Sequence, residues 1–331
     1  MAMMVIEGKY RIVGASPDGD SVRFYPNDPA DWDRVGGPHK VRRNASGGAQ
    51  LRLDAIDALE THFLTKAGEQ HQPHRFGDAA ASELLDWLGF TNVVRGGGGK
   101  VTKADPAEVP GYILTRTADV YGRCVAFAGK GAAPAASGSN VFVDVALVQR
   151  TVNYHQLARG LAYPTFYRKL FPDLRTAMTE AAKTARAEQL GLWPDDRTQI
   201  GASVANSRSL FDDVVVLPKL FRRLADYLAL NDGDLSLGGF SLYLDQRDDR
   251  LFVLSTGHST SLDTIVQVEE GNTVKLTVWI RWVRSADGVR RRTNRCWPSP
   301  TEAKGLPLAD AVGCPSWTRG RRLTLFVVMA K

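Results

Sequence analysis

Charged side chains inside one short apolar run constrain this chain more than any other feature of its sequence. Residues 51–62 read Leu-Arg-Leu-Asp-Ala-Ile-Asp-Ala-Leu-Glu-Thr-His. Alternate residues of a strand share a face, which would put Arg52 and Asp54 opposite Asp57. Neither face is purely apolar, so the run is not typical of a core strand. We expect the chain to leave the strand after Asp57 and to bring Glu60 back to the same place, where a metal ion and an anionic ligand would satisfy charges that are expensive to bury unpaired.

Two other stretches supply groups of the same kind. The turn Asp18-Gly19-Asp20-Ser21 leads into an alternating strand and places Asp20 at its mouth. The stretch Asp119-Val120-Tyr121-Gly122-Arg123 comes directly before another apolar strand. Together with residues 51–62, they offer two carboxylates for a hard cation, one carboxylate for a base, and two arginines.

In this order, the three stretches resemble the motifs of the staphylococcal (micrococcal) nuclease family. That family has Asp-Gly-Asp-Thr, then Arg-x-x-x-x-Asp-Thr-Pro-Glu, then Asp-Lys-Tyr-Gly-Arg, and the spacing within each motif is the same here. The resemblance covers roughly residues 5–200 and ends near Leu190-Gly191-Leu192-Trp193.

The resemblance implies a Ca²⁺ site built from oxygen ligands, the type that this hard cation prefers. The ligands would be the carboxylates of Asp20 and Asp57 and the backbone carbonyl of Ala58. The family has Thr and Pro where this chain has Ala58 and Leu59, but a carbonyl ligand needs no particular side chain. The alternative is that the two aspartates only cap backbone amides in turns.

The resemblance also implies a catalytic set. Glu60 would deprotonate or orient the attacking water. Arg52 and Arg123 would grip the phosphate and stabilise the charge of the transition state. Tyr121 would contact a substrate phosphate, or else serve packing. Ordinary ion pairs among these residues are the alternative, and Val120 replaces a family lysine.

The family fold predicts the class α+β: an OB-type five-stranded β-barrel with three helices. With 331 residues, the length suggests two domains. We expect a nuclease-like catalytic domain over residues 1–197 and a second, β-rich α+β domain of unknown function over residues 198–331, which is basic in its C-terminal part.

Apolar periodicity and turn residues predict the elements of the first part: strands over 8–25, 50–57, 111–117 and 123–128, and helices over 78–89, 141–160 and 173–190. The connecting segments are a long connection over 26–49, a polar loop over 61–77 and a glycine hairpin at 96–99. The expected elements of the second part are a helix over 214–230 and strands over 238–244, 250–255, 262–268, 273–284 and 323–328.

The net charge of +6 is concentrated at the C-terminal end, because residues 281–331 hold 11 basic and 3 acidic side chains. A basic patch is the electrostatic signature of polyanion binding, although a solvated surface can have the same composition. The run Arg290-Arg291-Arg292 is the candidate substrate-binding segment.

We expect a cytoplasmic protein with no membrane partner. No run approaches the roughly 20 apolar residues of a membrane helix, and residues 1–9 do not form a secretory signal. Three widely spaced cysteines do not make a disulfide framework. A regulatory ligand or protein at the C-terminal domain and a homo-oligomeric state both stay open.

The sequence therefore predicts a Ca²⁺-dependent phosphodiesterase acting on DNA, RNA or both; by family resemblance the 5′ oxygen leaves. One alternative is a non-catalytic nucleic-acid-binding OB module. Another is a gated defence nuclease whose C-terminal domain is a sensor, since an unsecreted nuclease would threaten its own cell.

Replacing Arg290, Arg291 and Arg292 by Ala should weaken nucleic-acid binding and flatten its dependence on salt. Each lost phosphate contact should lower the slope of log affinity against log salt by roughly 0.7 to 0.9. The measurement is a binding titration at several salt concentrations, and an unchanged slope would show that these arginines only solvate a surface.

Overall fold

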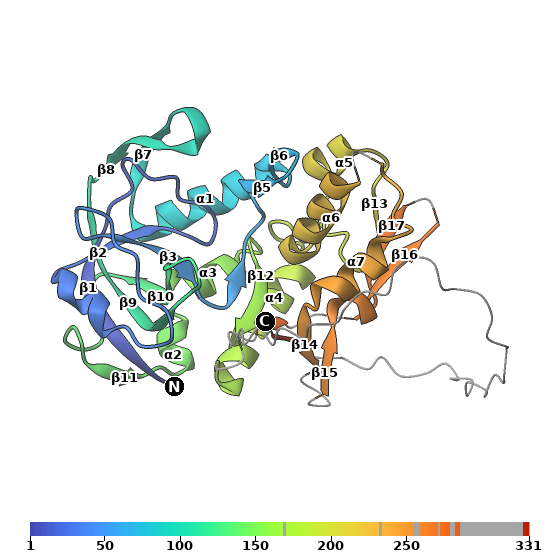
Figure 1. Ribbon diagram of the computed structural model, residues 1–331. Coiled ribbons are helices and arrows are strands. Elements are labelled where there is room, and N and C mark those ends of the chain that lie inside the picture. The colour runs from blue at the N-terminus through green and yellow to red at the C-terminus, as the bar shows by residue number, and fades with distance from the viewer. Residues whose placement is uncertain are drawn as a thin grey trace, which may run out of the picture.

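The chain forms a mixed α+β structure, in which a strand-rich N-terminal part lies beside a part built from the later helices and strands (Figure 1). This computed structural model describes residues 1–167, 170–231, 234–253, 258–270, 272–278, 282–284 and 327–330. No helix in that described portion is long and apolar enough to span a membrane.

Five strands of the N-terminal part pair in a closed ring. The order around the ring is β1, β2, β3, β10 and β9, and the pairing of β9 with β1 closes it. The pairing of β3 with β10 is parallel, with Leu51 opposite Cys124, and the other pairings in the ring are antiparallel. A sixth strand, β11, extends β1. The bounds are β1 (Ala2–Tyr10), β2 (Arg23–Pro26), β3 (Ala49–Leu53), β9 (Val109–Ala118), β10 (Cys124–Lys130) and β11 (Asn140–Phe142).

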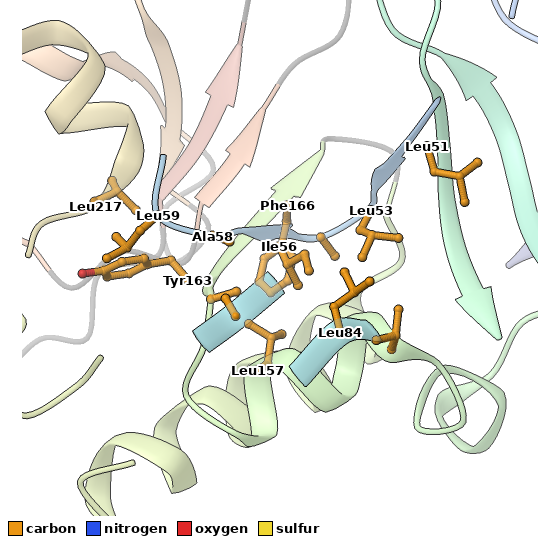
Figure 2. Close-up of a cluster of buried hydrophobic side chains, with 14 of the residues drawn as sticks. Leu51, Leu53, Ile56, Ala58, Leu59, Leu84, Leu157, Tyr163, Phe166 and Leu217 are labelled. Carbon is orange, nitrogen blue, oxygen red and sulfur yellow. The ribbon is translucent and has the colours of Figure 1, made fainter. Parts of the chain in front are cut away.

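Helices pack on the strand that carries the charged run, and its apolar residues face them. Figure 2 shows Leu53 and Ile56 beside Leu84 of α1 and Leu157 of α3, all of which are buried. The side chain of Asn153 is also buried and bonds the backbone of Asp54, Ala126 and Ala128, which fixes α3 to β10. The helices of this part are η1 (Pro29–Arg34), α1 (His74–Leu88), η2 (Gly97–Gly99), α2 (Val145–Val148), α3 (Val152–Ala158) and α4 (Pro172–Ala187).

Short strands connect this part to the C-terminal segment. Strand β12 (Tyr163–Tyr167) pairs with β4 (Ile56–Asp57) on one side and, in parallel, with β18 (Trp282–Arg284) on the other. Two hairpins complete the N-terminal part: β5 (Phe63–Thr65) with β6 (Gly68–Gln70), and β7 (Thr91–Arg95) with β8 (Val101–Asp105). The other elements after residue 197 are β13 (Ala202–Ser203), α5 (Ser207–Asp212), α6 (Pro218–Leu230), α7 (Phe240–Arg247), β14 (Arg250–Val253), β15 (His258–Ser261), η3 (Leu262–Thr264), β16 (Val266–Glu269), β17 (Thr273–Leu276) and β19 (Val327–Ala330).

The strands expected over 111–117 and 123–128, the helix expected over 173–190 and the glycine hairpin are confirmed as β9, β10, α4 and the turn between β7 and β8. The single helix expected over 141–160 is wrong. Asp144 and Thr151 each accept a hydrogen bond from a backbone N–H three residues later, so each caps a new helix inside that segment.

The strand expected over 238–244 is also wrong, because residues 240–244 lie in α7, where Phe240 and Leu244 are buried one turn apart. The loop expected over 61–77 contains the hairpin β5–β6. Helix α1 begins at His74 rather than at Asp78, and a Cβ at Gly77 in its first turn would lie 2.5 Å from Thr61 Cγ2. The helix expected over 214–230 begins at Pro218 rather than at Val214, because the fixed φ of proline suits the first helical position.

The segment expected as a strand over 262–268 divides into η3 and β16, and the one expected over 273–284 divides into β17 and β18. Strand β12 was not expected, and it is the strand that pairs with β18.

Gln72 joins the two parts of the molecule through its buried side chain. Its Oε1 accepts from Glu60 N at 3.1 Å, and its Nε2 donates to Val216 O at 2.7 Å. Gln72→Ala leaves both backbone groups without this partner, and each buried unsatisfied group costs about 1–3 kcal/mol. We expect the free energy of unfolding in urea to fall by about 2–4 kcal/mol.

Gln246→Ala is the control for this substitution, because Gln246 is exposed on α7. That change should stay within about 0.5 kcal/mol of the wild type. Equal free energies of unfolding for the two variants would show that the hydrogen bonds of Gln72 do not stabilise the contact between the two parts.

Candidate active site

A cavity of about 550 Å³ lies between the N-terminal strands and helix α6. Its wall is strongly charged and includes side chains from three distant stretches of the N-terminal part and from α6. All seven N-terminal residues that the sequence singled out line it: Asp20, Arg52, Asp57, Ala58, Glu60, Tyr121 and Arg123.

A turn inside the charged run brings its arginine and its aspartate together. Strand β3 ends at Leu53, Ala55 takes a left-handed backbone conformation with φ of 70°, and β4 begins at Ile56. The expected continuous strand over 50–57 is therefore wrong, and so is the expectation that Arg52 and Asp57 face opposite ways. Arg52 Nη2 instead donates to Asp57 Oδ1 at 2.6 Å.

Asp20 is held by a tight turn under helix α1. Its Oδ2 accepts from Ala58 N at 3.0 Å, so the two expected metal-ligand stretches touch directly. A Cβ at Gly19 would lie 2.6 Å from the Cβ atoms of both Ala58 and Ala80, which explains the glycine. Asp18 lines the same cavity, and burial, with the nearby charge of Asp20, raises the pKa of its carboxyl to about 7.

The cavity floor is a chain of alternating charges. Arg52 pairs with Asp20 as well as with Asp57. Arg222, from α6, pairs with Asp57 Oδ2 at 3.1 Å and with Glu60. These side chains are at most 21% exposed, so their charges interact with little screening by water.

Burial and neighbouring charges shift the protonation of two groups in this chain. Burial raises the pKa of the Glu60 carboxyl, and the Arg222 guanidinium opposes that rise. Burial lowers the pKa of Arg222, but the carboxylates of Asp57 and Glu60 outweigh it and keep this pKa above its usual value. Arg222 therefore stays charged.

Arg123 and Tyr121 are more exposed to solvent than the five residues of the charge chain. The Arg123 side chain is 35% exposed and donates from Nε to Asp119 Oδ2 at 2.7 Å. Asp119 Oδ1 accepts from the backbone N–H groups of Tyr121 and Arg123, so one carboxylate shapes the whole turn. Tyr121 is 71% exposed, and the centre of its ring lies 5.5 Å from the Arg123 guanidinium carbon.

Helix α6 supplies cavity residues that the sequence did not single out. Lys219, Arg222, Arg223 and Asp226 line the cavity at helical spacing i, i+3, i+4 and i+7, which is one face of the helix. The opposite face, including Leu220, Phe221 and Leu224, is buried. This charged face was visible in the sequence, but nothing in the sequence showed that it meets residues 52–60.

The donors present are of the right type for the expected Ca²⁺. Asp20, Asp57 and the Ala58 carbonyl offer only oxygen. One guanidinium, that of Arg52, contacts both carboxylates, so the two acids converge on a single positive group. In the part of the chain that the structure describes, no group of three or more His, Cys, Asp or Glu side chains is gathered to hold a metal.

The arginines of the basic run, Arg290, Arg291 and Arg292, lie outside the described residues. In comparisons with known proteins, neither a family model nor a curated protein matches this chain.

Asp249 clamps α6 at the cavity wall. It accepts from Lys219 Nζ at 2.6 Å and from Arg223 Nε at 2.5 Å and Nη2 at 3.0 Å. Burial raises the pKa of its carboxyl, but these cations outweigh burial and lower it from 3.8 to about 2.

Because the folded pKa lies below the unfolded one, ionised Asp249 stabilises the fold above about pH 4 and loses this effect as pH falls through about 2. Asp249→Asn should lower the free energy of unfolding by about 2 kcal/mol at pH 7. Urea unfolding should show this difference shrinking between pH 4 and pH 2.5, whereas a difference independent of pH would contradict the clamp.

Proposed function

We propose that this chain is a Ca²⁺-dependent nuclease that hydrolyses phosphodiester bonds of DNA, RNA or both. The single observation that carries the proposal is that three motifs, distant in sequence, line one cavity, with Arg52 bridging Asp20 and Asp57. Two carboxylates for a cation, a carboxylate for a base and arginines for a phosphate thereby face the same space.

The same proposal extends to the fold. We take the closed ring β1-β2-β3-β10-β9 as an OB-type five-stranded barrel of the nuclease-like kind, within a catalytic domain over residues 1–197. Residues 198–331 are then an accessory domain that supplies one wall of the active site and binds nucleic acid through its basic C-terminal part.

Each residue has a role that its position supports. Arg52 and Arg123 hold the two non-bridging oxygens of the scissile phosphate through planar guanidinium forks. Glu60 takes the proton of the attacking water, for which its partly buried, weakly screened carboxylate is suited. Tyr121 contacts a neighbouring phosphate near the solvent-exposed side of the site. Bound by Asp20, Asp57 and the Ala58 carbonyl, Ca²⁺ supplies Lewis-acid polarisation of a phosphoryl oxygen.

A second candidate function is non-catalytic binding of single-stranded nucleic acid. The observation that favours it is the exposed Tyr121 ring beside Arg123, an arrangement on which a base can stack. OB-type barrels bind oligonucleotides without any chemistry.

Cleavage of plasmid, single-stranded DNA or RNA should stop when EDTA is added and return with excess Ca²⁺. Asp20→Asn should weaken Ca²⁺ binding in calorimetry, because it removes an anionic ligand. Full cleavage in excess EDTA would exclude the proposed metal site.

Arg123→Ala separates the enzyme from the binding module. Loss of one preorganised charge contact in the transition state should lower the cleavage rate by about 10²-fold or more, while single-stranded DNA still binds within a modest factor. Arg123→Lys should not restore the full rate, since an ammonium cannot form the two-toothed contact.

Gel-based cleavage beside a binding titration in Ca²⁺ buffer measures both effects. If the wild type cleaves no nucleic acid and Arg123→Ala loses binding in full, the binding module is the correct function.

A further inference from the structure

Arg222 forms ion pairs with two carboxylates of the proposed site. It comes from α6, 162 residues after Glu60, and pairs with Asp57 and Glu60. These two side chains are the proposed metal ligand and the proposed base.

Both oxygens of Asp57 are engaged by guanidinium groups. Oδ1 accepts from Arg52 and Oδ2 from Arg222. A cation bound by Asp57 competes with these positive groups for the same oxygens, since like charges at contact distance repel strongly in a buried site. A guanidinium that gives up such an oxygen needs another anion within reach.

A phosphodiester held by Arg52 provides that anion. Arg52 and Arg222 lie on the two oxygens of one carboxylate, so they are neighbours, and a phosphate bound to one lies near the other. If the Arg222 side chain moves to that phosphate, it also releases Glu60, which cannot accept a proton readily while the Arg222 guanidinium donates to it.

The backbone of Arg222 is fixed, so only its side chain has to move. Leu220, Phe221 and Leu224 of α6 are buried, and Lys219 and Arg223 on either side of the residue are bound to Asp249. A swinging side chain on a fixed helix stays within the cavity instead of leaving it.

Resting on the proposed function, we infer that Arg222 is a third catalytic arginine, delivered by α6, which passes from Asp57 and Glu60 to the scissile phosphate when cation and substrate bind together. The catalytic set then includes a residue from beyond position 197, and a preorganised guanidinium there stabilises the charge of the transition state.

The test uses full-length wild type, Arg222→Gln and Arg222→Lys. Arg75→Gln is the control, because it removes one positive charge and one ion pair, with Asp195, outside the cavity. The binding probe is a short phosphorothioate oligothymidine, which resists hydrolysis, titrated in Ca²⁺ and in EDTA.

For the wild type, we expect Ca²⁺ to strengthen oligothymidine binding. In Arg222→Gln this strengthening should fall by roughly 10-fold or more, since hydrogen bonds from charged groups are the strong ones. Binding in EDTA should be equal in the two proteins. The cleavage rate should fall by about 10²-fold, and Arg75→Gln should match the wild type throughout.

Arg222→Gln leaves the buried carboxylate of Asp57 and the partly buried one of Glu60 with one partner fewer, so its folding is checked by circular dichroism. If it does not fold, Arg222→Lys decides the matter. It keeps the charge but not the planar fork, and should show a partial loss of both the Ca²⁺-dependent binding gain and the cleavage rate.

Two results would overturn the inference. Faster cleavage and tighter Ca²⁺ binding by both variants would show instead that Arg222 holds the site closed. A Ca²⁺-dependent gain in binding that is identical in wild type and variants would show that Arg222 does not reach the phosphate. Failure of the proposed function looks different: wild type neither binds Ca²⁺ in calorimetry nor cleaves any nucleic acid, and without any Ca²⁺-dependent gain the inference fails with it.

Discussion

The structure depends on one chain of buried and partly buried charges, in which Asp20, Arg52, Asp57, Arg222 and Glu60 alternate in sign. Desolvating five such groups is costly, and only close pairing repays that cost. Removing any one member takes one charged partner from each of its neighbours. The turn at residues 18–20, the break after β3 and the approach of α6 are therefore mutually dependent, because each brings one member of the chain into place.

Much of the N-terminal site could be predicted because its signals are local. The spacing of Arg52, Asp57 and Glu60, and the short turns at Asp20 and Arg123, are properties of a few adjacent residues. Their convergence in one cavity agrees with the prediction. The predictions that were wrong concern the backbone path between these residues. Alternation of side chains along a strand does not indicate the left-handed conformation of Ala55, which turns Arg52 toward Asp57.

The contribution of α6 could not be predicted for the same reason. Its sequence shows a charged face at Lys219, Arg222, Arg223 and Asp226, and solvation is the ordinary explanation for such a face. Only the three-dimensional structure shows that the face closes a cavity. The prediction of a single helix over 141–160 was wrong because this segment contains two capping residues. A capping residue inside an apolar run starts a new helix where periodicity alone would continue the first one.

Gly19, Ala58 and Ala80 meet where the Asp20 turn passes beneath α1. Three of the smallest residues fill this contact, one from each of three separate segments, so position 19 cannot gain a Cβ unless Ala58 and Ala80 give way. Over evolutionary time such positions are expected to change in concert or not at all. The identity of residue 80, on helix α1, is thus tied to the turn that carries the acid at position 20.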